Sequence, residues 1–164
     1  MFTKSLIPAM VAAILMVFAF GAQAQQMPNP YGGPITLEIA KKAAAGAVAE
    51  ARKNSWNMAV TITDTAGNLV YFEKMDGTQT ASIKISIAKS RSAAIFKRPT
   101  KTFQDAVTGG NNTILGLTGA MPSEGGIPIV IDGKIVGAIG ASGGTGQQDA
   151  MASQAGINAL KENK

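Results

Sequence analysis

Residues 125–144 read GGIPIVIDGKIVGAIGASGG, and this stretch decides the fold. Two runs rich in β-branched residues flank Asp132-Gly133, and Asp-Gly is the signature of a type I′ turn, which joins antiparallel strands. Residues 135–141 are therefore the returning strand of a hairpin. Pro128 suits an edge strand or the first residues of a strand, because its nitrogen cannot donate to a ladder. The stretch predicts an antiparallel hairpin that runs into a glycine-rich loop.

The other segments alternate between helical and strand patterns. Thr36 is a suitable N-cap for a helix whose apolar residues recur at three- and four-residue spacing. A second hairpin is expected where residues 64–68 supply the Asp, Gly and Asn of a hairpin loop. Beside the 125–144 hairpin, we expect a helix ending near residue 53, strands over 58–63 and 69–75, helices over 81–96 and 100–107, an irregular segment over 111–123, and a helix over 147–161. An antiparallel sheet flanked by helices is an α+β fold.

The expected helix over 81–96 carries apolar side chains on more than one face, among them Ile83, Ile87 and Ile95. A helix that is apolar on several sides is buried on several sides. In a domain of this size, the second buried side is expected to lie at a contact between subunits.

The first residues predict a secretory signal peptide over residues 1–24. A lysine supplies the positive charge, residues 7–20 are almost wholly apolar, and residues 22–24, Ala-Gln-Ala, form a small-x-small cleavage signal. The apolar run is shorter than the ~20 residues that a membrane-spanning helix needs. A Pro/Gly-rich leader over 25–34 is expected to be flexible, and the folded domain to cover 35–164. The mature protein is predicted to be periplasmic or secreted, with no membrane contact after the signal peptide is removed.

The composition excludes several kinds of chemistry. The chain has no cysteine and no histidine, which rules out disulfides, Cys/His zinc sites, covalent c-type haem attachment, Cys nucleophiles and a Ser-His-Asp triad.

The net charge of +5 is mild, but residues 89–101, KSRSAAIFKRPTK, contain five basic residues and no acid. Nucleic acid is not expected there, because aromatic residues are sparse and no binding motif occurs. The alternatives are a solvated face or a site for carboxylates of a ligand or a neighbouring subunit.

The glycine-rich loop resembles two functional motifs, the nucleophile turn of hydrolases and a phosphate-binding loop. Residues 140–144 match G-x-S-x-G, but a serine at that turn needs a histidine base and follows a parallel strand, so Ser142 is not expected to be a nucleophile. The loop also fails the G-x-G-x-x-G spacing, because Asp149 stands where the third glycine is needed. Asp149, in the first turn of the last helix, complements the helix dipole and repels a second anion. No catalytic residue is predicted, and the glycines are expected to let the backbone approach a partner subunit or a flat ligand.

Taken in order, the motifs resemble the GlcG/HbpS family of haem-binding and corrinoid-associated domains. They are VTITDTAGNLVYFEKMDGT at residues 60–78, a helix with Ser82 and Lys89, the 125–144 hairpin, and Gln148-Asp149 opening the last helix. The resemblance covers about residues 35–160. It implies a three-layer α/β/α domain with a five-stranded antiparallel sheet, similar to profilin-like folds. It also implies homo-oligomers built from dimers, often octamers.

The resemblance also implies a ligand. Secreted members of the family bind haem and are linked to iron or redox sensing and haem protection, whereas others accompany glycolate or propanediol metabolism or corrinoid adenosyltransferases. We therefore predict an exported haem-binding protein without catalytic activity, and cobalamin is the alternative ligand. Two further hypotheses stay open. One is a haem-degrading or small-hydroxy-acid enzyme that uses Lys89 or Asp76 as acid or base, and the other is a ligand-free structural or sensor-partner oligomer.

Candidate cofactor-binding residues follow from the matched motifs and from the possible metal donors. Because the chain has no histidine, a threonine hydroxyl, a tyrosine or a methionine would have to ligate the iron, and the metal ligand stays open. Basic residues within 89–101 are candidates to neutralise haem propionates. Core packing is the alternative explanation for Met75. The candidates are Tyr71, Met75, Asp76, Gly77, Ser82, Lys89, Gly125, Gly126, Pro128, Ser142 and Gly143.

Overall fold

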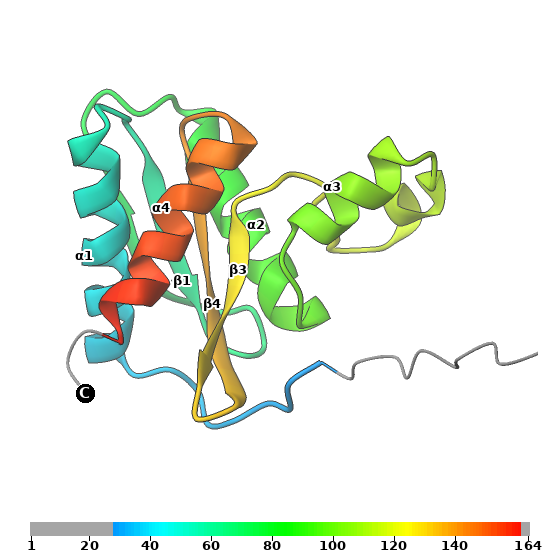
Figure 1. Ribbon diagram of the computed structural model, residues 1–164, viewed down its shortest axis with the longest axis horizontal. Helices are drawn as coiled ribbons and strands as arrows, with labels where there is room; N and C mark the ends of the chain where they lie inside the picture. The colour runs from blue at the N-terminus through cyan, green and yellow to red at the C-terminus, as the bar shows by residue number, and fades with distance from the viewer. Residues whose placement is uncertain (1–27, 162–164) are drawn as a thin grey trace, which may run out of the picture.

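The structure is a computed structural model that describes residues 28–161. Its elements follow the predicted order (Figure 1), and their ends differ from the predicted ones by at most two residues. They are α1 (Leu37–Lys53), β1 (Ala59–Thr63), β2 (Leu69–Lys74), α2 (Ala81–Phe96), α3 (Lys101–Thr108), the 3₁₀ segment η1 (Asn112–Gly116), β3 (Gly126–Ile131), β4 (Lys134–Ser142) and α4 (Gly146–Ala159). The predicted signal peptide lies outside the described residues. Within residues 28–161, no helix is long and apolar enough to cross a membrane.

Both predicted hairpins form, and their turns explain why. Asp132 and Gly133 have φ values of 48° and 74°, so both central residues adopt the positive φ that a type I′ turn requires. In the β1–β2 turn, a carboxylate oxygen of Asp64 accepts hydrogen bonds from the backbone N–H groups of Ala66 at 2.9 Å and Asn68 at 2.8 Å. The short polar side chain thus replaces part of the backbone pairing within the turn.

The sheet has four antiparallel strands in the order β2-β1-β4-β3, so the expectation of five strands is wrong for the described residues. The N-terminal arm, residues 28–35, takes a place beside the first residues of β4, beyond the end of β1. Its backbone bonds to β4 at three points, including Gly32 N to the Ile135 carbonyl at 2.8 Å. The arm forms one isolated parallel bridge, Tyr31 to Ile135, and no strand, because its sequence Tyr-Gly-Gly-Pro is poor in strand formers and its proline lacks a donor.

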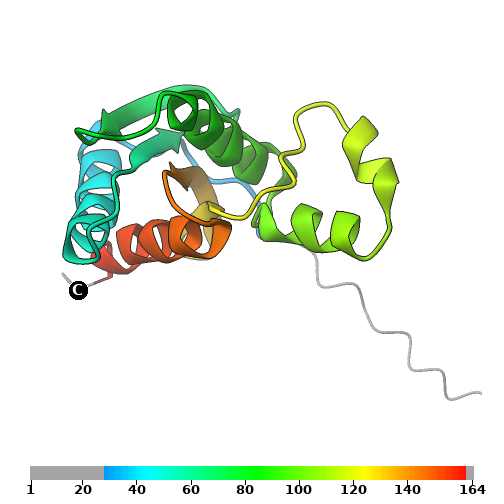
Figure 2. The ribbon, with the colours of Figure 1, turned by 90° about the horizontal axis from the view of Figure 1, so that it is seen from above.

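The sheet separates two helical layers, which confirms the predicted α/β/α arrangement. Figure 2 shows α1 and α4 on one face of the sheet and α2 on the other. The α1–α4 face is apolar: Val60 and Ile62 of β1 and Ile139 of β4 are buried against the alanine-rich side of α1. Gly46 of α1 allows close contact, since a Cβ there would overlap the Cβ of Ala159 in α4. This layer is the main hydrophobic core.

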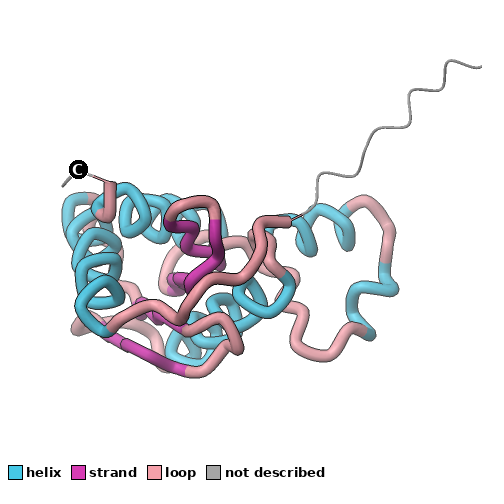
Figure 3. The backbone as a smooth tube through the Cα atoms, turned by 90° about the horizontal axis from the view of Figure 1, so that it is seen from below, coloured by secondary structure: helices cyan, strands magenta, loops and turns pink. Residues whose placement is uncertain are grey.

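Helix α3 and η1 stand apart from the two layers. Figures 1 and 3 show the segment from α3 to β3 as a loop that extends sideways from the sheet and returns to it. Both leucines of this segment are exposed, Leu115 at 64% and Leu117 at 45%. The base of this loop, where α2 turns into α3, meets the β3 edge of the sheet and the N-terminal arm.

Candidate functional site

The face of α2 that touches the sheet is polar. Hydroxyl pairs cross the interface, with Thr61 and Ser86 at 2.9 Å and Thr63 and Ser90 at 2.9 Å. Small residues are needed there because α2 lies very close to β4: a Cβ on Gly140 would overlap the backbone of α2 at Ser86 and Ser90. The isoleucines of α2 are consequently on its outer face, partly exposed, and the serines are inside.

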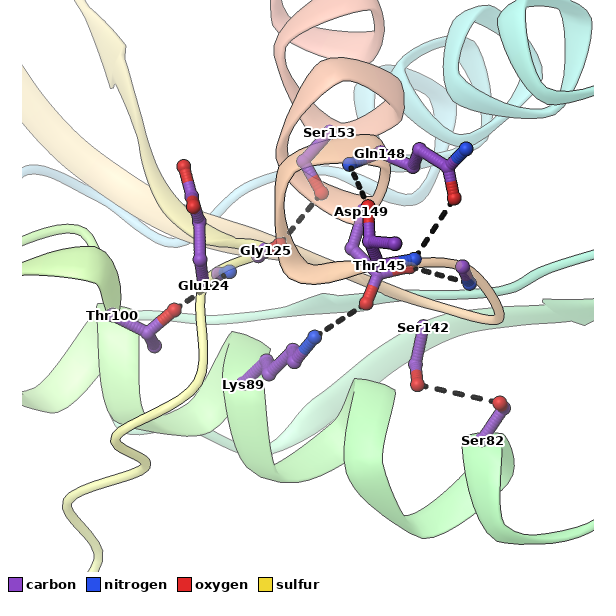
Figure 4. Close-up of polar contacts among 12 residues, drawn as sticks. Ser82, Lys89, Thr100, Glu124, Gly125, Ser142, Thr145, Gln148, Asp149 and Ser153 are labelled. Atoms are coloured by element: carbon purple, nitrogen blue, oxygen red, sulfur yellow. Dashed lines mark hydrogen bonds and ion pairs between the residues drawn. The ribbon is translucent and has the colours of Figure 1, made fainter. Parts of the chain in front are cut away.

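A buried ion pair joins the two helical layers (Figure 4). Lys89 of α2 donates to Asp149 of α4 at 2.6 Å, and the two side chains are 2% and 3% exposed. The other carboxylate oxygen of Asp149 accepts from the Gly144 N–H at 3.0 Å. Burial raises the pKa of Asp149, while the hydrogen bonds from Lys89 and Gly144 act in the opposite direction. The sequence predicted Asp149 in the first turn of the last helix, but not its partner.

Gly125, the residue directly before β3, completes this buried polar cluster. We define the cluster as Ser82, Lys89, Gly125, Ser142, Asp149 and Ser153. The Ser153 hydroxyl donates to the Gly125 carbonyl at 2.7 Å, and the Ser142 hydroxyl donates to Ser82 at 3.3 Å. Gly125 has a φ of 128°, and a Cβ there would meet Asp149 and the Lys89 ammonium. Glycine is therefore required at this position both by conformation and by space.

The candidate residues from the sequence fall into separate places. Five of them, Ser82, Lys89, Gly125, Gly126 and Ser142, come together around the buried polar cluster. Tyr71 and Met75 pack instead against the core on the α1 face, as the core-packing alternative for Met75 anticipated. Asp76 and Gly77 are exposed in the turn after β2, Gly143 is packed against the backbone of Asn57, and Pro128 lines the pocket described below.

The buried polar cluster has its hydrogen bonds satisfied internally. In the described part of the chain, every buried side-chain nitrogen and oxygen atom has a hydrogen-bond partner, and no group of three or more acidic residues is arranged to hold a metal ion. The contacts of the cluster thus account for holding α2, β3 and α4 together. That its residues also bind a cofactor stays a prediction.

An open pocket of about 700 Å³ lies at the β3 edge of the sheet. Ligand pockets commonly have volumes of 300–1,000 Å³. Strands β3 and β4 supply an apolar floor, the turn between α2 and α3 supplies two cations, and the N-terminal arm supplies one wall. The lining residues are Pro28, Asn29, Lys97, Arg98, Pro99, Thr102, Ile127, Pro128, Val130 and Ile135.

The cations of the open pocket come from the basic segment that the sequence singled out. Of its five basic residues, Lys97 and Arg98 line the pocket. Lys89 is paired with Asp149, and Lys101 pairs with Asp105 on the exposed side of α3. Arg91 donates from Nε to the Gly67 carbonyl at 3.1 Å. The sequence could not separate these roles, since they depend on where the chain turns after α2.

A smaller pocket of about 390 Å³ lies on the outer face of α2. Ile87 and Ala88 of α2 and Met121 give it an apolar lining, and Lys84 and Arg91 flank it. Together with Ile95, which is 37% exposed, this face matches the expectation that α2 is apolar on a second side. A contact between subunits at this face stays a prediction.

Comparisons with known proteins agree with this architecture. The sequence matches the family described as "Haem degrading protein HbpS-like" over residues 35–158. Protein GlcG of Escherichia coli K12 is 34% identical over 108 residues, which cover 66% of this chain and 81% of GlcG. A double mutant of Streptomyces reticuli HbpS has a TM-score of 0.72 at 28% identity, over 87% of this chain and 94% of that one. A PduOC:haem complex has a TM-score of 0.71 at 25% identity, over 77% of this chain and 94% of that one.

An α/β/α domain with an antiparallel sheet is the class that the fold defines. Within that class, the chain belongs to the HbpS-like family, which confirms the resemblance drawn from the motifs.

Proposed function

We propose that this protein is an exported, homo-oligomeric binding protein for haem or a similar tetrapyrrole, and that the ligand occupies the open pocket. The observation that carries the proposal is the composition of this pocket, an apolar floor bordered by the adjacent cations Lys97 and Arg98. A tetrapyrrole such as haem has a flat apolar ring and carboxylates at one edge. Membership of the HbpS-like family and the similarity to the PduOC:haem complex support the choice of ligand.

The residues present fit most of what haem needs. Ile127, Val130 and Ile135 offer apolar contact to a ring, and Lys or Arg binds carboxylates through charge-assisted hydrogen bonds. A residue that holds the iron would differ from the histidine or cysteine of common haem proteins, because the chain has neither. Among the lining residues, the Thr102 hydroxyl and the Asn29 carbonyl oxygen are the neutral oxygen donors. When bound, haem would supply an iron centre that binds small ligands or exchanges electrons.

Hemin titration of the mature protein tests this proposal. We expect a saturable shift of the Soret band, and a spectrum identical to that of free hemin would contradict it.

Val130→Trp should weaken binding at least tenfold, because Val130 lines the pocket and is 41% exposed, so the indole can occupy the space without disturbing the core. Leu69→Trp is the matched control, a strand residue 55% exposed on the opposite edge of the sheet, and should bind hemin normally. A parallel titration with cobalamin distinguishes the alternative ligand.

Haem degradation is the second candidate, favoured by the description of the family. Incubation of the hemin-loaded protein with a reductant in air separates the two activities. Release of iron and of a linear tetrapyrrole, faster than from hemin bound to an unrelated protein, would establish an enzyme. A stable Soret band over the same period would support binding without turnover.

Self-association is proposed to use the outer face of α2. Its support is the half-exposed isoleucines and the apolar pocket beside Ile87. Ile87→Glu places a charge in that contact and should reduce the particle mass of the mature protein in light scattering to that of one chain, with an unchanged circular dichroism spectrum. Lys41→Glu, at an exposed position of α1 on the other side of the sheet, is the control for a change of charge alone. Wild-type protein with the mass of a single chain would contradict the proposal.

Export is proposed from the sequence of residues 1–24. Expression of the full chain in a bacterial host should yield a shortened protein in the periplasm or medium whose N-terminus is Gln25. Recovery of uncleaved protein from the cytoplasm would contradict this proposal.

A further inference from the structure

Lys97 has an unusual backbone conformation. It follows the last residue of α2 and adopts the left-handed region, with φ 56° and ψ 31°. Glycine is the usual residue at such a helix end, because a side chain with a Cβ is strained there. A lysine at this position therefore costs stability, and strain of this kind is typical of residues whose side chain has a function.

The N-terminal arm holds the Lys97 side chain in place. The Lys97 ammonium lies 4.1 Å from the centre of the Tyr31 ring, within the range of a cation–π interaction. Tyr31 is itself fixed, since its hydroxyl lies 2.9 Å from the Ala94 carbonyl and 3.1 Å from the Ile95 carbonyl and donates to this pair. These carbonyls belong to the last turn of α2, where intrahelical N–H donors run out. The Ala94 carbonyl also accepts from the backbone N–H of Lys97 at 3.3 Å, so the Tyr31 hydroxyl adds to the pairing at this helix end. Tyr31 of the arm thus does two things: its hydroxyl caps the end of α2, and its ring positions the Lys97 ammonium.

The position of Lys97 in the open pocket suits recognition of an anion. Lys97 and Arg98 are the cations among its lining residues. Arg98 is exposed, and its Nε donates to the Phe96 carbonyl at 3.0 Å, which occupies one of the five N–H donors of the guanidinium. Lys97 contacts the face of an aromatic ring, which leaves its ammonium N–H groups able to donate to a ligand. No acidic side chain lines this pocket within residues 28–161.

We propose that Lys97 is the specificity-determining residue of the open pocket, selecting flat apolar ligands that carry a carboxylate at one edge, and that Tyr31 is its positioning residue. This inference rests on the proposed function, because it concerns the same pocket. It goes further because it predicts different affinities for two ligand classes that share one ring. Free acids gain affinity from Lys97, whereas esters of the same ring do not.

Metal-free porphyrins provide the test, because they have no iron to ligate. Fluorescence titrations would compare protoporphyrin IX with its dimethyl ester in the same dilute detergent. Lys97→Gly should weaken binding of the free acid about tenfold or more, as expected for loss of a charged hydrogen bond, and leave binding of the ester unchanged. The melting temperature should stay the same or rise, because glycine relieves the strain. Lys97→Arg should restore most of the preference for the acid.

Two controls separate the role of the cation from effects on the fold. Ser55 also has a positive φ, 59°, so Ser55→Gly relieves similar strain far from the pocket and should not alter either affinity. Tyr31→Ala should reduce the preference for the free acid, whereas Tyr31→Phe, which retains the ring, should preserve more of it.

The outcomes distinguish this inference from the proposed function. If the wild-type protein binds neither hemin nor protoporphyrin IX, the proposed function is overturned and this inference with it. If it binds hemin but neither metal-free porphyrin, only the role of Lys97 is overturned. If the wild type binds the free acid and Lys97→Gly binds it equally well, the role of Lys97 is overturned while the pocket remains the binding site. An equal loss of affinity for acid and ester would likewise overturn it, since that pattern indicates damage to the pocket.

Discussion

Replacing Lys89 with methionine is expected to lower the free energy of unfolding by about 3–5 kcal/mol, because removing one partner of a buried ion pair leaves the other charge uncompensated. The Asp149 carboxylate, buried in the wild type, would keep the Gly144 N–H as its hydrogen-bond donor. Asp149→Asn should be similarly destabilising, since it leaves the Lys89 ammonium without its anion. Urea denaturation followed by circular dichroism measures both.

The exposed ion pair of α3 is the matched control for this prediction. Lys101 and Asp105 are also 2.6 Å apart, but their side chains are 52% and 58% exposed. Lys101→Met should leave the urea midpoint unchanged, because exposed pairs contribute little. If Lys89→Met unfolds at the same urea concentration as Lys101→Met, the buried pair does not hold α2 and α4 together. A double variant, Lys89→Met with Asp149→Leu, should recover part of the loss, since no buried charge remains.

The second large effect is expected from Gly140→Ala. The added methyl group would overlap the backbone of α2 at Ser86 and Ser90, and neither backbone segment can rotate away as a side chain could. Overpacking of this kind commonly costs about 1–3 kcal/mol, and an overlap with two backbone atoms of α2 is expected to cost an amount at the upper end of this range. The same urea experiment reports the loss.

A matched glycine is available in η1. A Cβ on Gly116 would meet no atom within 4 Å, so Gly116→Ala adds the same methyl group without overlap. We expect Gly116→Ala to be neutral or slightly stabilising, because alanine restricts the unfolded chain more than glycine does. Equal stability of the two variants would mean that α2 can move away from the sheet at little cost.

The elements of the fold were predictable because their signals are local. Thr36 caps α1 by accepting from the Ile39 N–H at 3.3 Å, and Asp132-Gly133 adopts the turn that its sequence requires. The number of strands was not predictable in this way. The expectation of five came from the resemblance, and whether the arm pairs as a strand depends on contacts with β4 that lie far away in the sequence.

The candidate site was predicted less completely, for the same reason. Lys89 and Asp149 are 60 residues apart, and each had a plausible local explanation, one as part of a basic segment and the other as a helix-dipole partner. The sequence predicted no role for Tyr31, because it lies in a leader rich in proline and glycine. One signal was available for Lys97: a charged residue directly after an apolar helix, followed by Arg98-Pro99, marks a turn with two adjacent cations.

The N-terminal arm has a consequence for biosynthesis. It leaves the ribosome among the first residues of the domain, whereas β4, to which it binds through Ile135 and Val136, is one of the last strands to emerge. Contacts between segments so distant in the chain form slowly, since they require closure of a long loop. The wall that the arm gives to the open pocket is therefore completed only after nearly all of the chain has been synthesised. A nascent chain that stops before β4 has neither a place for the arm nor a pocket for a ligand.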